Sequence, residues 1–235
     1  MNWSKHVFSH GAITTVKPGL YQVQGTLGRS PLPRNMVVAT LPSGGLWIHS
    51  AIALDPPGMT ALEHLGTPEV LVVPNAFHRA DAGVYKQRYP SLRVLCPRTA
   101  IPAVSKVVAV DASCEEGMEE TGITVHPVPG IGGAEVVFEV PVGDEQHALV
   151  LNDLLFNLPH QSGAAGWVLR YITASTGGLK CTRVGPWVLR WDLAQVGDFL
   201  RQRSEAPGLV ALTVAHGDAV VTDTAEKLRS ASDSL

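Results

Sequence analysis

Four apolar segments of the chain each end in a short polar cluster, and this repeated arrangement constrains the fold more than any other feature. The segments are residues 46–48, 70–73, 149–151 and 209–214. Short continuous apolar runs of this kind predict strands that are covered on both faces. The polar side chains that follow are His49, then His78 and Asp81, then Asp153, and finally His216. Because several strand ends can deliver such side chains to one edge of a sheet, the pattern predicts a candidate metal centre in an α/β protein.

Composition narrows the class of protein. Hydrophobic residues make up 45% of the chain and charged residues only 17%, which is typical of a well-buried globular core. The net charge of −3 gives no basic surplus for nucleic acid, and no apolar stretch reaches the ~18 residues that a membrane helix needs. Three widely spaced cysteines argue against a disulfide framework, and the N-terminus lacks a signal-peptide pattern. We therefore expect a cytoplasmic protein without a nucleic-acid or membrane partner.

The first half of the chain changes character part-way. Residues 19–23, 36–40 and 46–49 are rich in β-branched or aromatic residues and are bounded by Gly and Pro, which predicts an antiparallel meander. Beyond them the pattern alternates between expected helices and strands, at residues 59–66, 70–73, 82–89 and 91–95. Such alternation predicts a parallel segment of sheet.

The second half continues the alternation. Residues 134–140 and 147–151 predict a hairpin, and residues 192–200 predict an amphipathic helix with Leu193, Val196 and Leu200 on one stripe. A last strand at residues 209–214 and a last helix at 222–228 follow, whereas residues 162–178 give no clear pattern. With no linker or internal repeat, residues 1–235 are expected to form a single α/β domain.

The order of the polar clusters resembles that of the metallo-β-lactamase fold superfamily along nearly the whole chain. The segments that carry the resemblance are Ile48-His49-Ser50, Phe77 through Gly83, Val128-Pro129-Gly130-Ile131, Asn152-Asp153 and His216-Gly217. The resemblance implies an αββα four-layer sandwich of two mixed sheets with helices outside, and a site at one edge between the sheets.

Aligned residue by residue, the chain retains only part of the family's metal-binding set. His78 falls on the second histidine of the family's histidine cluster, Asp81 on its last histidine, Asp153 on the metal-bridging aspartate and His216 on the late histidine. Three further ligand positions are occupied by side chains that cannot bind a metal, namely Ala76, Ala80 and Ile131. The resemblance therefore implies a depleted site with four candidate ligands: His78, Asp81, Asp153 and His216.

The chemistry of these four candidate ligands leaves two functions open. Mixed nitrogen and oxygen ligation suits one Zn, Mn or Fe ion, and Asp153 and His78 would then be the catalytic residues of a hydrolase acting on an ester, amide or phosphoester. Alternatively the fold is retained without a metal, as a non-catalytic module that binds a small molecule or a protein. Three other histidines are candidate substitute ligands that spacing cannot place in the site: His49, His126 and His160.

Aromatic and basic residues alternate in the region after Asp153. The aromatic residues are Trp167, Tyr171, Trp187 and Trp191, and the basic residues are Arg170, Lys180, Arg183 and Arg190. The aromatic rings would form a wall for a ligand, pack in the core, or make the contact of a homodimer. The basic side chains would bind an anionic substrate or contact an adjacent subunit.

Overall fold

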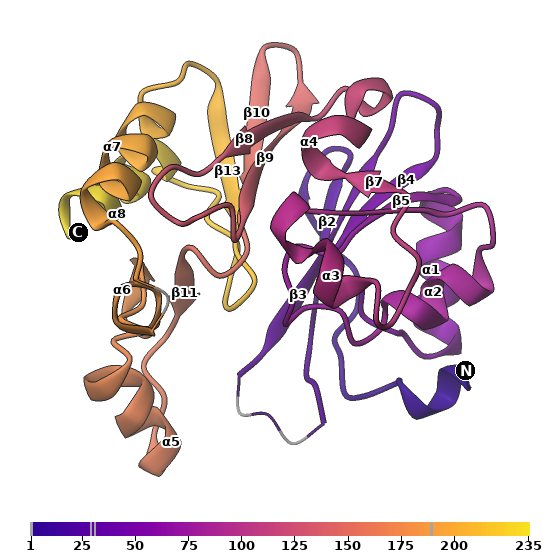
Figure 1. Cartoon of the computed structure of the whole chain (residues 1–235), viewed down its shortest axis with the longest axis horizontal. Helices are drawn as coiled ribbons and strands as arrows, with labels where there is room; N and C mark the ends of the chain where they lie inside the picture. Colours follow the sequence, from indigo (N-terminus) through magenta and orange to yellow (C-terminus); the bar gives the residue numbers. More distant parts are fainter. Residues whose placement is uncertain (1, 29, 31, 189) are drawn as a thin grey trace. The chain divides into compact units, whose positions relative to one another are not determined.

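The structure is a computed structural model, and it describes residues 2–28, 30, 32–188 and 190–235. The contacts within the chain group into two compact units, Met1–Val125 and His126–Leu235. Each unit contains a mixed β-sheet with helices packed on it, as Figure 1 shows. The sequence predicted one domain over residues 1–235, and it gave no boundary near residue 125.

The first unit is built on a seven-stranded sheet in which the strands follow one another in chain order. The strands are β1 (Thr14–Lys17), β2 (Leu20–Gly25), β3 (Arg34–Thr40), β4 (Leu46–His49), β5 (Pro68–Val72), β6 (Arg93–Cys96) and β7 (Ala112–Ser113). Neighbours from β1 to β4 pair antiparallel, and neighbours from β4 to β7 pair parallel. Both the predicted meander and the predicted parallel segment are therefore confirmed.

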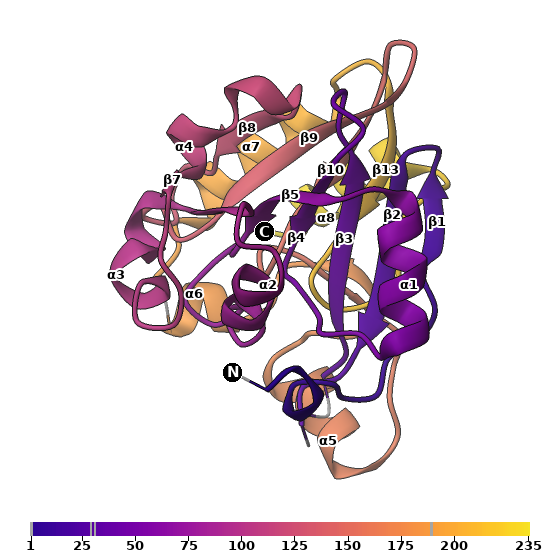
Figure 2. The same ribbon diagram turned by 90° about the vertical axis from the view of Figure 1, so that its right-hand side faces the viewer.

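The helices of the first unit are short, with at most ten residues each among those described. They are η1 (Trp3–Lys5), α1 (Pro56–Leu65), α2 (Ala82–Arg88), η2 (Arg98–Ala100), α3 (Ile101–Val104), α4 (Cys114–Gly117) and η3 (Glu119–Thr121). Helix α1 begins at Pro56 rather than at residue 59, because Asp55 caps it by accepting a hydrogen bond from the Gly58 N–H at 2.8 Å. Figure 2 shows α1 and α2 beside the sheet, and Leu62 of α1 packs into the core with Ile48 and Leu71.

The second sheet has the strand order β13-β10-β9-β8, and the boundary after Val125 falls within β8. Its strands are β8 (Thr124–Pro127), β9 (Val136–Gly143), β10 (Gln146–Val150) and β13 (Leu209–Thr213), and a separate pair consists of β11 (Phe156–Leu158) and β12 (Gly178–Lys180). β9 and β10 form the predicted antiparallel hairpin, and β10 pairs with β13 in parallel. Two strands that are distant in sequence thus end side by side.

Five helical segments complete the second unit. They are α5 (Gly163–Trp167), η4 (Val168–Ile172), α6 (Val184–Val188), α7 (Leu193–Ser204) and α8 (Thr224–Asp233). Asp192 caps α7 by accepting hydrogen bonds from the N–H groups of Ala194 and Gln195, and the helix buries Val196 and Leu200 against the sheet. The segment without a clear sequence pattern contains α5 and η4. Among the described residues, no helix is both long and apolar enough to cross a membrane.

Candidate metal centre

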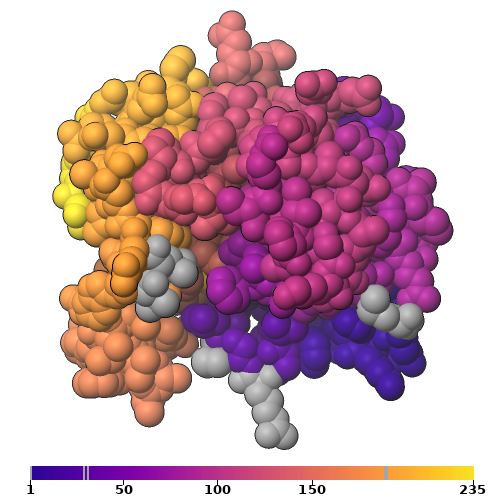
Figure 3. Space-filling view, viewed as in Figure 1, coloured from indigo at the N-terminus to yellow at the C-terminus, as the bar shows by residue number. Residues whose placement is uncertain are grey.

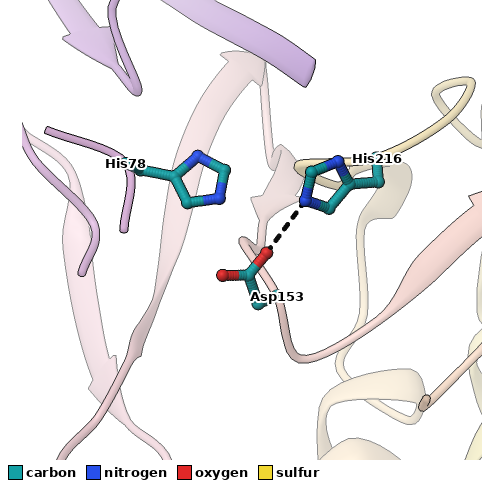
Figure 4. A group of neighbouring side chains, drawn as sticks. All are labelled: His78, Asp153 and His216. Atoms are coloured by element: carbon teal, nitrogen blue, oxygen red, sulfur yellow. Dashed lines mark ion pairs between the residues drawn. The ribbon is translucent and has the colours of Figure 1, made fainter. Parts of the chain in front are cut away.

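Asp153 and His216 follow two neighbouring parallel strands of the second unit. Asp153 comes shortly after the end of β10 and His216 shortly after the end of β13. The His216 Nε2 lies 3.2 Å from the Asp153 Oδ1, and Figure 4 shows this ion pair as a dashed line. The Asp153 side chain is 25% exposed and the His216 side chain 11%. The strand ends therefore deliver an imidazole and a carboxylate to one place that a small ligand can reach.

A buried carboxylate supports the loop that carries Asp153. Glu135, which directly precedes β9, is only 2% exposed and accepts hydrogen bonds from the backbone N–H groups of Asn152, at 2.6 Å, and Asp153, at 2.8 Å. Burial, and then the negative charge of Asp153, raises the pKa of Glu135 to about 8, although the backbone N–H groups oppose the shift. These bonds fix the backbone of Asp153 and thereby the position of its side chain.

Both the side chain and the backbone of His216 are held by neighbouring residues. The Phe156 ring packs against the imidazole with ring centroids 4.5 Å apart, and the Asn157 N–H donates to the His216 carbonyl oxygen at 2.9 Å. At Gly217 the backbone has φ 113°, and an added Cβ would lie 1.9 Å from the Asn157 carbonyl oxygen. A glycine is required after His216, because the chain turns there against β11.

His78 lies in the first unit, in the turn between β5 and α2. The Asn75 Oδ1 accepts from the N–H groups of Phe77 and His78, at 2.8 and 3.1 Å, so Asn75 forms the turn that presents the histidine. The His78 Nδ1 lies 3.0 Å from the Ser50 Oγ, and Ser50 itself has a left-handed backbone with φ 58°. A hydrogen bond at Nδ1 orients the ring and leaves ligation to Nε2. Three side chains of metal-ligand type, His78, Asp153 and His216, are drawn in Figure 4.

Asp81 does not have the environment of a metal ligand. It is fully buried, and its Oδ2 lies 2.5 Å from the Arg34 Nη2 and accepts from the Ala53 N–H at 3.2 Å. Its Oδ1 lies 3.0 Å from the His6 Nδ1. Both carboxylate oxygens are therefore engaged in a buried ion-pair network. The sequence grouped Asp81 with His78 as a metal ligand, whereas the structure places the Asp81 carboxylate against Arg34, His6 and the Ala53 N–H, with no side-chain bond to the start of α2.

The remaining candidate histidines have structural partners of their own. His49 is 1% exposed and stacks on Trp47, with ring centroids 5.6 Å apart. The His126 Nε2 lies 3.0 Å from the Glu139 Oε2, and the His160 Nδ1 lies 2.9 Å from the Thr176 Oγ1. Each of the three imidazole rings therefore has a structural contact within the protein.

Ile131 occupies the turn position where the resemblance expects a histidine. It is 5% exposed and packs in the apolar core of the second unit with Val128 and Trp191. The position is therefore part of the core. An ion that needs a third histidine from this turn would have no ligand there.

The comparisons with known proteins bear on the fold. The sequence matches no family model and no curated protein. The structure is similar to that of the metallo-β-lactamase DIM-1, with a TM-score of 0.63 and 14% identity over 97% of this chain and 98% of that one. The chain has the metallo-β-lactamase fold. This finding confirms the predicted α/β class with two mixed sheets and helices.

Two further metallo-β-lactamases show the same degree of similarity. The enzyme from Pontibacter korlensis has a TM-score of 0.59 and 13% identity over 95% of this chain and 99% of that one. FIM-1 from Pseudomonas aeruginosa, solved in a mono-zinc form, has a TM-score of 0.58 and 14% identity over 97% of this chain and 96% of that one. At such identities, the likeness concerns the fold.

Two residues of the centre were missed at the level of sequence. Ser50 orients His78, and Glu135 holds the Asp153 loop. The signal for Glu135 was an acidic residue immediately before the apolar run at residues 136–138, which begins β9. A carboxylate in such a place is expected to be buried and to need hydrogen-bond donors.

Proposed function

We propose that the chain is a metal-dependent hydrolase with one metal ion bound by His78, Asp153 and His216. The observation that carries the proposal is the Asp153–His216 pair at the ends of the adjacent strands β10 and β13, 3.2 Å apart and partly exposed. His78 joins them on the strength of its position in the resembled motif and of its fixed ring orientation. The proposed ion is Zn, Mn or Fe.

The donor set fits a single ion. Two imidazoles and one carboxylate form a set that first-row transition metals accept while keeping open positions for water and substrate. A second ion would need ligands at Ala76, Ala80 and Ile131, and Ile131 is buried in the core. Asp81 is already paired with Arg34. The proposal is therefore limited to a mononuclear site.

The residues of the chain would share the work of hydrolysis. A bound ion of this type lowers the pKa of a coordinated water to about 7 and polarises an ester, amide or phosphoester oxygen. Asp153 has a second carboxylate oxygen, which can accept a hydrogen bond from the attacking water and orient it. Glu135 and Phe156 keep Asp153 and His216 in place, so that little reorganisation is needed when a substrate binds.

The decisive experiment measures metal binding and its dependence on Asp153 and His216. Protein purified without chelator is expected to contain about one equivalent of metal per chain, and added Zn or Mn should raise the melting temperature of the stripped protein. Asp153→Asn and His216→Ala should each weaken metal affinity at least 10-fold. Turnover of a panel of p-nitrophenyl esters, phosphoesters and anilides should be lost on chelation and restored by the metal.

His160→Ala is the matched control, since it removes a histidine from the same unit that is bonded to Thr176. Its metal content should equal that of the unaltered protein. If the stripped protein neither binds Zn or Mn nor gains stability from them, the proposal fails.

A second candidate function is a non-catalytic binding module. Two observations favour it: Asp153 and His216 already pair directly with each other, and Asp81 pairs with Arg34 and His6. In that case the Asp153–His216 ion pair replaces the metal, and Asp153→Asn should lower stability without any effect of added metal. The metal titration thus separates the two functions.

A further inference from the structure

The segment between the two aspartates Asp153 and Asp192 has an unusual composition. Residues 154–191 contain no Asp or Glu but carry Arg170, Lys180, Arg183 and Arg190. The whole chain has a net charge of −3, so this positive charge is strongly localised. Any partner of this segment is therefore expected to be anionic.

The same segment exposes large apolar side chains. Ten large hydrophobic residues are exposed among those described, and six of them fall in this stretch: Trp167, Val168, Tyr171, Ile172, Val184 and Trp187. Trp187 is 66% exposed and Trp167 is 56% exposed. A concentration of this kind on a surface marks an interaction site. We call these six residues together with Arg170 and Arg183 the aromatic–basic patch.

Contacts within the segment hold the patch together. The Trp167 and Tyr171 rings lie 5.7 Å apart between centroids, and the Arg170 guanidinium lies 5.2 Å from the Tyr171 ring centre. Arg183 connects α6 to η4, because its Nη1 donates to the Tyr171 carbonyl oxygen at 3.0 Å and its guanidinium lies 5.4 Å from the Trp187 ring centre. The two helical pieces therefore present their rings and cations on a connected surface.

The part of the patch that α5 carries lies at one end of the second unit. Figures 1 and 2 both show α5 at the end of this unit opposite the turn of the β9–β10 hairpin. Figure 3 shows the atoms of this stretch, in salmon and orange, at the surface of the unit.

We propose that the aromatic–basic patch binds the surface of an anionic lipid bilayer. Tryptophan and tyrosine prefer the level of the headgroups, valine and isoleucine insert more deeply, and arginine binds lipid phosphates while its stem stays in apolar surroundings. Pairing with a second copy of the chain through this patch would bring arginines against arginines, which opposes such a dimer. The sequence excluded a membrane partner because no stretch could span a bilayer, and that criterion does not concern binding at the surface.

A cavity beside the patch supports the anionic character of the partner. It has a volume of about 400 Å³ and shares Arg183 with the patch. Lys180 also lines it, together with Thr182, Ser230 and Leu235, the last residue of the sequence. The described lining includes no Asp or Glu side chain, so its two cations face one main-chain carboxylate. A phosphate group with an apolar substituent matches such a lining, since Leu179 and Leu193 form its apolar part.

Vesicle co-sedimentation tests the proposal with the full-length protein. Binding is expected to vesicles of phosphatidylcholine with 30% phosphatidylglycerol, to fall steeply as salt is raised, and to be absent with phosphatidylcholine alone. The double change Trp167→Ala with Trp187→Ala should lower the partition coefficient at least 10-fold, and Arg170→Glu should lower it severalfold. Phe77→Ala, which removes a 75% exposed ring in the first unit, should leave it unchanged.

Three outcomes would overturn the proposal. The first is an absence of binding to the anionic vesicles at low salt by a protein with an unaltered circular dichroism spectrum. The second is retention on an acidic polypeptide or on DNA through the same residues without vesicle binding, which would assign the patch to that partner. The third is a concentration-dependent dimer that Trp167→Ala dissociates, again without vesicle binding. Metal content does not enter any of these readouts, so the result is separate from that of the metal titration.

Discussion

At the scale of single residues, Asp81 shows how one carboxylate can have a structural role at a position where the resembled motif has a ligand. Its partners Arg34 and His6 stand 47 and 75 positions away in the chain. No local pattern connects residues at such separations, and the pairing exists only when β3 and the N-terminal segment are in place. A ligand assignment from motif order alone therefore fails at this residue, whereas Asp153 and His216 meet as the motif predicts.

The buried pair of Asp81 and Arg34 leads to a stability prediction. The Arg34 side chain is 8% exposed, so Asp81→Asn leaves a buried guanidinium without its counter-charge, and we expect a loss of about 3–5 kcal/mol in the free energy of unfolding. Urea denaturation of the metal-free protein measures it. Glu116→Gln is the control, because Glu116 pairs with Arg98 on the surface and its loss should have little effect. Equal midpoints for the two variants would show that the buried pair contributes little.

At the scale of elements, the loop after β10 depends on a residue from the start of β9. Glu135 accepts N–H groups from this loop, and its pKa is raised to about 8. In the folded protein Glu135 thus binds a proton between pH 4.5 and 8 that the unfolded chain releases. Since the folded state binds more protons in this window, its stability should fall as the pH rises from 4.5 to 8.

Substitution of Glu135 isolates this contribution. Glu135→Gln cannot titrate, so the urea midpoint of the metal-free variant should change less between pH 5 and pH 8 than that of the unaltered protein. Titrating groups that do not interact with Glu135 are common to both proteins and cancel in the comparison, whereas the charge of Asp153 acts on Glu135 and belongs to the measured contribution. Glu145→Gln, in the exposed turn between β9 and β10, controls for the loss of one carboxyl group. Parallel pH profiles for the unaltered protein and Glu135→Gln would contradict the assignment of the buried proton to Glu135.

Most elements of the fold could be predicted because their patterns are local. The continuous apolar runs gave β5 and β13, and the alternation of strand and helix gave the parallel half of the first sheet. The pair β11 and β12 could not be predicted, because its strands have three residues each and their partner lies about twenty positions away. Helix α5 and η4 were also missed, since most of their large apolar side chains are exposed, Leu169 being the exception, and give no periodic stripe.

At the scale of the whole molecule, the proposed ion would take its ligands from both units. His78 belongs to the first unit, and Asp153 and His216 belong to the second. If one ion uses all three, its binding stabilises both units together, by about 2.7 kcal/mol when the free metal exceeds the dissociation constant 100-fold. The motif order suggested such sharing, because the resembled family draws its ligands from segments spread over the chain.

A double-mutant cycle between the units tests this sharing. His78→Ala and His216→Ala should each weaken Zn affinity, measured by competition with a chromophoric chelator. Because both side chains would ligate the same ion, the double variant should lose less than the sum of the two single losses, with an interaction energy of about 0.5–3 kcal/mol. Hydrogen exchange should show metal-induced protection in the β5–α2 turn and in the loops after β10 and β13. Protection confined to the second unit, with a Zn affinity that His78→Ala leaves unchanged, would assign the ion to Asp153 and His216 without the first unit.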